Sequence, residues 1–490
     1  MKLKKLVLAT ILPLLVAALL LAACSTPSTP STSAPAPAPP PATTAAPPPP
    51  STTQAPPAQP SPTQAPPTQA PPTQAAGPSE ILIGAARHMT GMFAGMGQGG
   101  EFGFKAAIED VNSTGGIFIK QYNRKIPVRE IMVDSQSDPT KMGSLAENLL
   151  LRDKVNFLTT SNGTTGDFVG AANLADRNKI PYISVVGPAE VWGGVRSQMN
   201  PPWEYAWALG FAIGTPAPPE DFRSKPGYTQ MESWMGMLAK FGSQTNNTAG
   251  VFASDDAAGR GFYGGIVQAL KAGNVNTIGT DKELGIFPMG TTDYTAIIQQ
   301  WINNKVEILW GNSPAPEFGT MWRQCQTLGF KPKMVFAGRA ALYYTDVAAW
   351  GGDLPLGIGC ELQWSPTAKN SPGIGSTTPQ SLADRWTKAM NQPLNEAIGW
   401  DYTVAQVLFS AIEKAGTLDG TEVNKALKAT DASTIWNRVV FDANHFSRCA
   451  ITFGQWVKTD KPGTWEHQVV FSQHDFVPVQ HDPIFPIPYK

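Results

Sequence analysis

Short apolar runs alternate with amphipathic stretches over most of the chain after residue 80. Residues 81–86 (ILIGAA) form an apolar run that predicts a buried strand. Residues 101–112 follow with apolar side chains at helical spacing, and residues 125–135 form a second strand-like run. Strand, helix and strand in this order predict a βαβ unit.

The same alternation continues along the chain and begins again after residue 210. It predicts helices at residues 139–153, 167–178, 259–272, 293–304 and 317–329. It predicts strands at residues 155–160, 180–186, 247–256, 306–312 and 333–338. Strands that alternate with helices form parallel sheets covered on both faces, so two such series indicate an α/β protein with two doubly wound lobes. The roughly 410 residues involved also exceed the usual size of one hydrophobic core.

A different pattern opens the chain. Lys2, Lys4 and Lys5 precede an apolar run that ends in small residues and Cys24. These features predict a signal peptide over residues 1–23. The pattern resembles a bacterial lipobox, in which the cysteine is lipidated, so we expect Cys24 to anchor the chain to the cell membrane. The alternative is an uncleaved transmembrane anchor, because the run is close to the ~20 residues that span a bilayer. Both interpretations place the rest of the chain outside the cytoplasm.

Residues 24–79 consist almost entirely of Pro, Ala, Thr, Ser and Gln, and the unit TQAPP recurs at Thr53, Thr63 and Thr68. Such a composition offers no apolar surface to bury, so we expect a disordered linker. Its proline content favours extended polyproline II structure, which could reach on the order of 100 Å at ~3.1 Å per residue. We interpret it as a stalk that carries the domain formed by residues 80–490.

Charge and cysteine content narrow the function classes. The net charge is −1, and no run of Lys or Arg occurs after the N-terminal one, so we expect no nucleic-acid partner. In an oxidising compartment one pair among Cys325, Cys360 and Cys449 is plausible, and we favour Cys360 with Cys449 as a possible disulfide. His467, His474 and His481 are evenly spaced, but this is a weak metal pattern, and we expect neither metal nor cofactor.

Residues 95–100 (GMGQGG) match the dinucleotide-binding pattern G-x-G-x-x-G. A dinucleotide loop follows its strand at once, whereas residues 87–94 intervene here. The acid at the end of the next strand, Asp134, lies well beyond the expected spacing of about 20 residues. We therefore interpret the motif as a flexible loop that brings backbone close to a ligand and opens a helix.

Several segments, taken in order, resemble the substrate-binding proteins of branched-chain amino acid ABC transporters, the Leu/Ile/Val-binding group of type I periplasmic binding proteins. The segments that carry the resemblance lie at residues 81–116, 133–150, 155–166, 253–262, 293–312 and 318–332. The resemblance implies two lobes joined by a hinge, which close on a small ligand and present it to an ABC permease. It implies a monomer without catalytic activity.

The lobes implied by this resemblance are discontinuous. We expect lobe 1 to contain residues of about 80–205 and 365–440. We expect lobe 2 to contain residues of about 206–364 and 441–490.

In lobe 1 the loop SNGTTG lies between a predicted strand and a helix. Its amide groups at the helix N-terminus, with Gly163, Thr164 and Thr165, suit a carboxylate, although a threonine could simply cap the helix. We also expect ligand contacts from backbone at Val186 and Gly187. Met92 and Phe93 precede the glycine motif and complete the candidate set in this lobe.

In lobe 2 the resemblance points to Ala258 and Ser313, at positions where relatives often carry an aromatic residue. Arg339 stands where an acid would hold the ammonium group of an amino acid. A buried ammonium group without a counter-charge costs several kcal/mol, and an arginine favours an anionic group. We therefore expect an amino acid-like ligand, a carboxylate or an aromatic acid, with carboxylates that lack an amine favoured. The alternative is that Arg339 faces solvent or pairs with Asp346.

The chain carries 14 tryptophans, most of which we expect in the core. Trp192 and Trp310 are the tryptophans we expect to reach the ligand.

Two further functions keep the same export signal. The first is a tethered receptor that senses a ligand without transport. The second is an exported hydrolase, which the sequence disfavours because G-x-S-x-G is absent and the adjacent carboxylates Asp255 and Asp256 on a strand end point apart.

Overall fold

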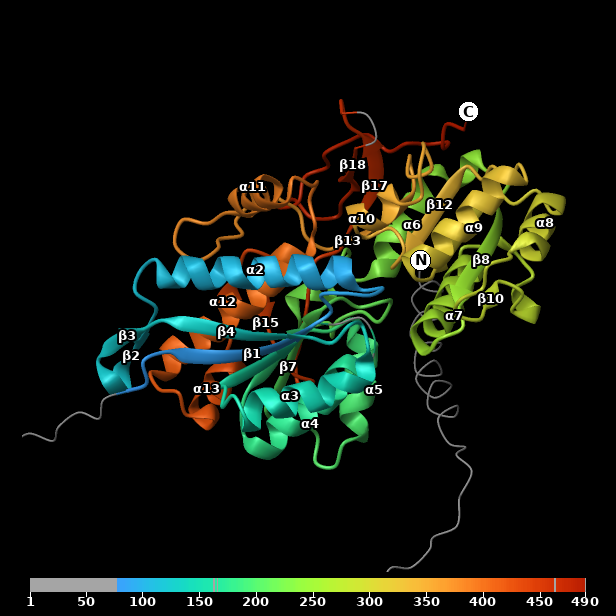
Figure 1. Ribbon diagram of the computed structural model, residues 1–490. Coiled ribbons are helices and arrows are strands. Elements are labelled where there is room, and N and C mark those ends of the chain that lie inside the picture. Colours follow the sequence, from blue (N-terminus) through green and yellow to red (C-terminus); the bar gives the residue numbers. More distant parts are fainter. Residues whose placement is uncertain (1–76, 162–163, 165, 462–463, 490) are drawn as a thin grey trace, which may run out of the picture. The chain divides into compact units, whose positions relative to one another are not determined.

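The computed structural model describes residues 77–161, 164, 166–461 and 464–489, and residues 77–490 belong to one compact unit (Figure 1). The signal peptide, Cys24 and nearly all of the predicted linker lie outside the described residues. Among the described helices, none has both the length and the hydropathy needed to cross a bilayer.

Lobe 1 is built on a parallel sheet with the strand order β16-β7-β6-β5-β1-β4. Its strands are β1 (Ile81–Arg87), β4 (Val128–Asp134), β5 (Phe157–Thr160), β6 (Tyr182–Val185), β7 (Ala206–Gly210) and β16 (Phe446–Arg448). Two small hairpins belong to other sheets and comprise β2 (Ile117–Ile119), β3 (Arg124–Ile126), β14 (Asp431–Ser433) and β15 (Arg438–Val440).

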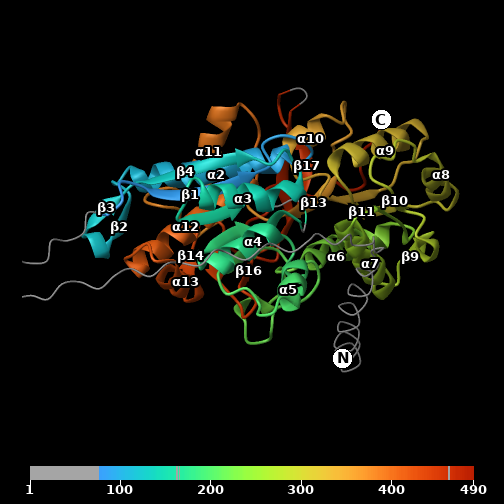
Figure 2. The same cartoon turned by 60° about the horizontal axis from the view of Figure 1, so that its bottom comes forward.

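Helices cover both faces of this sheet, and α3 and α4 lie side by side in both views (Figures 1 and 2). The helices are α2 (Ala94–Asn112), α3 (Met142–Leu151), α4 (Gly166–Asn178), α5 (Ala189–Gln198), α11 (Pro379–Met390), α12 (Ala397–Ala415) and α13 (Gly420–Lys428). Alternate residues of β1 point to the two layers. Ile81 and Ile83 join the core that contains α2 and α12, whereas Leu82 packs on the core of α3 and α4.

Lobe 2 contains a mixed sheet with the order β10-β8-β11-β12-β13-β17-β18, and β9 pairs with β8. Its strands are β8 (Thr248–Ser254), β9 (Asn276–Ile278), β10 (Ile286–Phe287), β11 (Ile308–Asn312), β12 (Met334–Gly338), β13 (Gly359–Leu362), β17 (Thr452–Lys458) and β18 (Trp465–Phe471). Its helices are α6 (Gln230–Phe241), α7 (Ala257–Ala272), α8 (Thr295–Asn303), α9 (Ala315–Thr327) and α10 (Tyr344–Ala348). The expected α/β fold with two doubly wound lobes is confirmed.

The chain passes from one sheet to the other after β7, after β13 and after β16. Strand β7 pairs with β6, and β16 pairs with β7. The first sheet therefore takes up residues 206–210 and 446–448, which the expected boundaries assign to lobe 2.

The glycine motif is not a loop. Helix α2 begins at Ala94, so residues 95–100 form its first turns, and the expectation of a flexible loop is wrong. Gly97 and Gly103 explain why. A Cβ atom at these positions would lie 1.9 Å from the His88 carbonyl oxygen and 2.0 Å from that of Ile398. The glycines allow α2 to approach the end of β1 and α12 closely.

The possible disulfide between Cys360 and Cys449 does not form, because both cysteines are free and buried. Cys360 lies in β13 opposite Gly454, and its thiol donates to the Ala341 carbonyl oxygen at 3.0 Å. Cys449 follows β16 of the other sheet, and its thiol lies 3.8 Å from Gln363 Oε1. The two thiols thus contact different partners, one in the second sheet and one just after β16 of the first.

Candidate functional site

A polar cluster lies at the carboxyl-terminal edge of the first sheet. His88 directly follows β1, and Ser135 directly follows the neighbouring strand β4. His88 Nδ1 lies 2.7 Å from Ser135 Oγ, and His88 Nε2 lies 3.2 Å from a carboxylate oxygen of Asp167 in the first turn of α4. All three side chains are buried. This edge is where open parallel sheets bind ligands.

A chain of Ser, His and Asp is also the arrangement of a hydrolase triad. Here Ser135 Oγ donates to the Arg87 carbonyl oxygen at 3.0 Å, and Ser135 has 0% exposed surface. A nucleophile must reach the substrate carbon that it attacks. The geometry therefore suits a rigid support for the loop after β1 better than acyl transfer.

Met92 and Phe93, the two ligand contacts predicted in the loop after β1, lie at the end of this loop next to α2. Met92 is 45% exposed, and the half-buried Phe93 occupies the N-cap position of α2 without a capping hydrogen bond from its side chain. The ring of Phe93 has its centroid 5.4 Å from that of His88. An exposed thioether and an aromatic ring thus lie beside the buried polar cluster.

The loop before α4 is described only in part, since Gly163 and Thr165 lie outside the described residues. The backbone N–H of Thr164 donates to Asp167 at 2.5 Å. The carboxylate of Asp167 therefore already accepts one of the amide groups that we predicted for a ligand carboxylate.

Val186 and Gly187 follow β6. The amide of Val186 donates to the Leu209 carbonyl oxygen at 2.7 Å. A Cβ atom at Gly187 would lie 2.6 Å from the ring of Phe211. Val186 is therefore held by β7 itself, and Gly187 lies close to Phe211 in the segment that leaves β7 toward lobe 2.

A second polar cluster lies at the carboxyl-terminal edge of the lobe 2 sheet. Asn312 of β11 aligns with Ala253 of β8 and with Gly338 of β12. The next residues along these strands are Ser254, Ser313 and Arg339, so side chains distant in sequence form one row.

Arg339 is bound within this row. Its Nη2 lies 2.8 Å from Asp256 Oδ2 and 2.5 Å from Ser254 Oγ. Asp256 is the N-cap of α7 and also accepts from the Gly259 amide at 2.8 Å. Arg339 thus pairs with Asp256 instead of the alternative partner Asp346, and the guanidinium is already balanced by one carboxylate.

The backbone of Arg339 has φ of 62°, a conformation that is rare for residues other than glycine. Such strain persists where surrounding contacts hold it, as the Asp256 pair does here, and it is common at ligand-binding loops.

Electrostatics support an ionised pair. Burial acts to raise the pKa of Asp256, but the hydrogen bond and charge of Arg339 and the Gly259 amide hold it below its usual value. Glu317 of α9 lies near the same pair, and burial raises its pKa. The Glu317 carboxylate accepts from the Gly290 amide at 2.9 Å. The cluster therefore offers donors and acceptors without a large positive excess.

Several buried polar atoms of this cluster have no hydrogen-bond partner among the described residues: Asn312 Oδ1, Ser313 Oγ, Glu317 Oε2 and Arg339 Nε. Buried polar atoms without partners are costly, so they mark places where a ligand or water can bind. Ser313 belongs to this set, whereas Ala258 contributes only a small half-buried side chain in the first turn of α7.

The two tryptophans expected to reach the ligand are both fully buried in hydrophobic clusters. Trp192 packs with Phe168 and Trp203 under the first sheet, and Trp310 stacks on Phe336 in lobe 2. This expectation is wrong, because the α/β layers absorb both rings as core.

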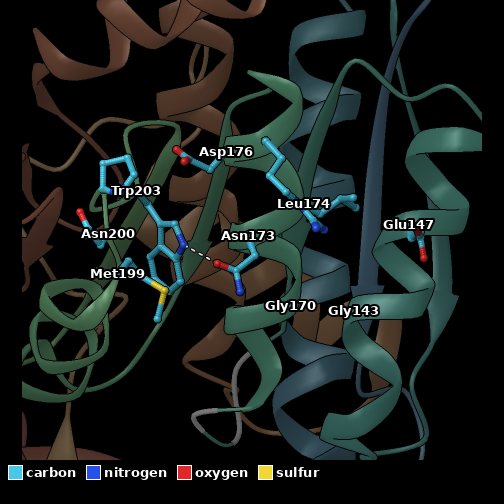
Figure 3. A pocket seen from close by; sticks show the side chains of 11 residues that line it. Gly143, Glu147, Gly170, Asn173, Leu174, Asp176, Met199, Asn200 and Trp203 are labelled. Carbon is cyan, nitrogen blue, oxygen red and sulfur yellow. Dashed lines mark hydrogen bonds between the residues drawn. The ribbon is translucent and has the colours of Figure 1, made fainter. Parts of the chain in front are cut away.

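A cavity of about 540 Å³ lies elsewhere, between α3, α4 and the segment before β7 (Figure 3). Asn173 Oδ1 accepts from Trp203 Nε1 at 2.7 Å, and Asp176 accepts from the Glu204 amide at 2.6 Å. None of the predicted site residues lines it, and its polar side chains hold the local structure, so we do not place the ligand there.

Within the described part of the chain, no group of three or more His, Cys, Asp or Glu residues is placed to hold a metal ion. His467 stacks on Trp456, and His474 Nε2 lies 2.7 Å from the Gly227 carbonyl oxygen. The evenly spaced histidines are thus engaged separately.

Sequence reasoning did not single out His88, Ser135 or Asp167, and it weighed Asp256 only as a catalytic carboxylate. Each lies at or just beyond a strand end or in the first turn of a helix, so position at the carboxyl end of a predicted parallel strand was the available signal. The pairing of Asp256 with Arg339 had no such signal, because the two residues are 83 positions apart.

Comparisons with known proteins agree with the fold. Residues 80–461 match the family of periplasmic binding proteins. A branched-chain amino acid transporter substrate-binding protein from Streptococcus pneumoniae, in complex with isoleucine, is similar at 16% identity and a TM-score of 0.61, over 80% of this chain and 99% of that one.

Two other solved structures are equally similar. A solute-binding protein of an ABC transporter from Rhodopseudomonas palustris, in complex with 3,4-dihydroxybenzoic acid, has 18% identity and a TM-score of 0.61, covering 82% of this chain and 99% of that one. A leucine-binding protein from Thermotoga maritima has 15% identity and a TM-score of 0.60, covering 80% and 99%. Since the family match covers well over half of the sequence, the chain belongs to the periplasmic binding protein family.

Proposed function

We propose that this protein is an extracytoplasmic solute-binding protein that captures a small ligand between its lobes and delivers it to an ABC permease. The observation that carries the proposal is the row formed by Ser254, Ser313 and Arg339, with its unpartnered buried atoms, at the edge where parallel sheets bind ligands. Met92, Phe93, the loop of Gly163, Thr164 and Thr165, and Val186 with Gly187 are the proposed contacts from lobe 1.

The ligand is an amino acid-like molecule, a carboxylate or an aromatic acid, and the Arg339–Asp256 pair narrows its chemistry. The guanidinium donates to a carboxylate, and the adjacent Asp256 accepts from an ammonium or hydroxyl group. We therefore propose a ligand that carries a carboxylate and a hydrogen-bond donor. Isoleucine and 3,4-dihydroxybenzoic acid, which are bound by two similar proteins, both meet this description.

The proposal also assigns roles to the N-terminal segment. Lipidation at Cys24 anchors the protein to the membrane, and residues 24–79 act as a stalk that lets a monomeric domain reach the permease. Mass spectrometry of the membrane fraction tests the anchor, because a Cys24→Ser variant would lose the lipid and appear in the soluble fraction.

Thermal denaturation of the purified full-length chain tests the ligand class. L-isoleucine, 3,4-dihydroxybenzoate and benzoate form a matched panel, because benzoate keeps the carboxylate and lacks the donor. A true ligand at 100 times its Kd adds ~2.7 kcal/mol of stability. We expect benzoate to stabilise least, and no shift with any amino acid or hydroxylated acid would refute the proposal.

Arg339→Ala should weaken the ligand found in this way by at least about tenfold, as loss of a charged hydrogen bond predicts. Arg260→Ala is the matched control, since Arg260 pairs with Asp255 on the exposed surface of the same lobe. Equal affinities for the two variants would remove Arg339 from the site.

A further inference from the structure

Helix α2 is unusually rich in glycine at its start, where Gly95, Gly97, Gly99 and Gly100 fall within its first turns. Glycine is a poor helix former, so its use here needs a packing reason. A Cβ atom at Gly99 would lie 2.4 Å from Asn395 Oδ1, and one at Gly100 would lie 2.6 Å from Asp401 Oδ2. These contacts, like those of Gly97, lie within lobe 1.

Gly95 differs, because its neighbour comes from lobe 2. A Cβ atom at Gly95 would lie 3.2 Å from ring carbons of Tyr343. Tyr343 precedes α10 on the segment that follows β12 and Arg339. The ring of Tyr343 also lies edge-on to Trp400 of α12, with centroids 6.5 Å apart. A tyrosine of lobe 2 therefore rests in a seat formed by Gly95 and Trp400 of lobe 1.

This seat is buried and specific in shape. Tyr343 is 5% exposed and Trp400 is 3% exposed. Asn395 Nδ2 donates to the Gly95 carbonyl oxygen at 2.7 Å, which fixes the turn on which the ring rests. The Tyr343 hydroxyl and Trp400 Nε1 lack partners among the described residues, so shape and apolar contact hold the ring, not a hydrogen bond.

We propose that Tyr343 is a positioning residue, whose seat on Gly95 sets the angle between the lobes and couples the Arg339 segment to α2. A side chain at Gly95 would push the ring away and shift the population toward arrangements with the lobes further apart. The angle between the lobes is measured on ligand-free protein, so only the affinity readout rests on the proposed function.

The test measures the distance between spin labels on the lobes of the ligand-free full-length protein. Lys141→Cys in lobe 1 and Lys282→Cys in lobe 2 provide exposed label sites, in a Cys24→Ser background. We expect Gly95→Val to lengthen or broaden the distance distribution and Tyr343→Phe to leave it unchanged, because the ring is retained. Gly264→Ala in α7 is the helical control, since nothing lies within 4 Å of a Cβ atom there.

A double-mutant cycle separates the seat from a general effect on helix α2. If Gly95 exists to seat the ring, Gly95→Val should change little in a Tyr343→Ala background, and Tyr343→Ala alone should shift the distances even if Gly95→Val fails to fold. Identical distances in wild type, Gly95→Val and Tyr343→Ala would overturn the proposal, as would additive effects.

Affinity for L-isoleucine and 3,4-dihydroxybenzoate provides the second readout. We expect Gly95→Val to weaken whichever of them binds by about three- to tenfold, because fewer molecules hold the competent arrangement. Shifted distances without binding of either probe would uphold the seat and count against the proposed ligand class instead.

Discussion

At the scale of single residues, the partner of Arg339 decides how the second sheet presents its charge. An unpaired arginine would select anions, whereas the contact with Asp256 at 2.8 Å supplies a counter-charge within the protein. Selectivity between zwitterions and simple acids therefore depends on the acid at position 256 as much as on the arginine.

Asp256→Asn should shift selectivity toward simple carboxylates. Asparagine keeps the N-cap acceptor for α7 but removes the charge, so Arg339 becomes free to bind an anion. Isothermal titration should show benzoate gaining affinity relative to L-isoleucine. Asp256→Ala controls for the cap, whose loss costs about 1 kcal/mol. An unchanged ratio for Asp256→Asn would argue against ligand contact with this pair.

The state of the cysteines also predicts that reductants do not change the stability of the protein. Cys360 and Cys449 are buried free thiols, and burial raises the pKa of both well above the usual value. A thiol of that kind is unreactive. Melting temperatures measured with and without dithiothreitol should coincide. A lower melting temperature with dithiothreitol would indicate that a disulfide does form.

At the scale of elements, identical residues in two helices have opposite roles. Gly103 of α2 faces the backbone of Ile398 in α12, and a Cβ atom there would lie 2.0 Å from a carbonyl oxygen. Gly264 of α7 is exposed and has nothing within 4 Å. Gly103 is required for the close packing of the two helices, whereas Gly264 only lowers the stability of α7.

Gly264→Ala should therefore stabilise the protein by up to about 1 kcal/mol through helix propensity. Gly103→Ala should destabilise it by about 1–3 kcal/mol, because the helices must move apart. Urea denaturation followed by circular dichroism measures both. Similar changes in the two variants would contradict the packing of α2 on α12.

At the scale of the whole molecule, buried carboxyl groups lie where the chain crosses between sheets. Glu396, which precedes α12, accepts from the Gln363 amide at 2.7 Å, just beyond β13. Burial, with a smaller contribution from Glu361, raises the pKa of Glu396 to about 8. Burial likewise raises the pKa of Glu361 to about 7. At neutral pH the folded state therefore keeps most of the proton on Glu396 and about half of the proton on Glu361.

The sign of the pH effect follows from this retention. The unfolded chain loses these protons near pH 4.5, so stability falls as the pH rises toward 7 and 8. Buried His445 and His467, whose pKa burial lowers to about 4, act in the opposite direction below pH 6.5. Between pH 6.5 and 8 the carboxyl groups dominate, and one group contributes a slope of about −1.4 kcal/mol per pH unit.

Glu396→Gln should make the unfolding free energy depend less steeply on pH, because the amide resembles the protonated acid but does not titrate. Its unfolding free energy should approach that of wild type only near pH 4.5, the unfolded pKa, and should exceed it increasingly from pH 6 to pH 8. Glu413→Gln, at an exposed position of the same helix, should keep the wild-type slope. Parallel pH profiles for wild type and Glu396→Gln would refute a protonated carboxyl group at the crossing.

Much of the fold followed from the sequence because burial leaves a local trace. The predicted strand at residues 81–86 is confirmed by β1, and the helix at 167–178 is confirmed by α4 within a residue. Strand β7 and helix α5 left weaker traces and were not predicted. The site was harder to predict from the sequence. Arg339 and Ser313 were identified, but the contact between Arg339 and Asp256 was not.

The sequence by itself determined the α/β class, the two series of strands and helices, the family, and the strand ends at which polar residues collect. These properties depend on hydrophobic periodicity, which is read within a short window. Tertiary structure alone decided that Arg339 meets Asp256, that Cys360 and Cys449 remain free thiols, and that the glycines of α2 lie against backbone or side chains of other elements. Such contacts join residues far apart in the chain, and only the packing of complete lobes brings them within reach.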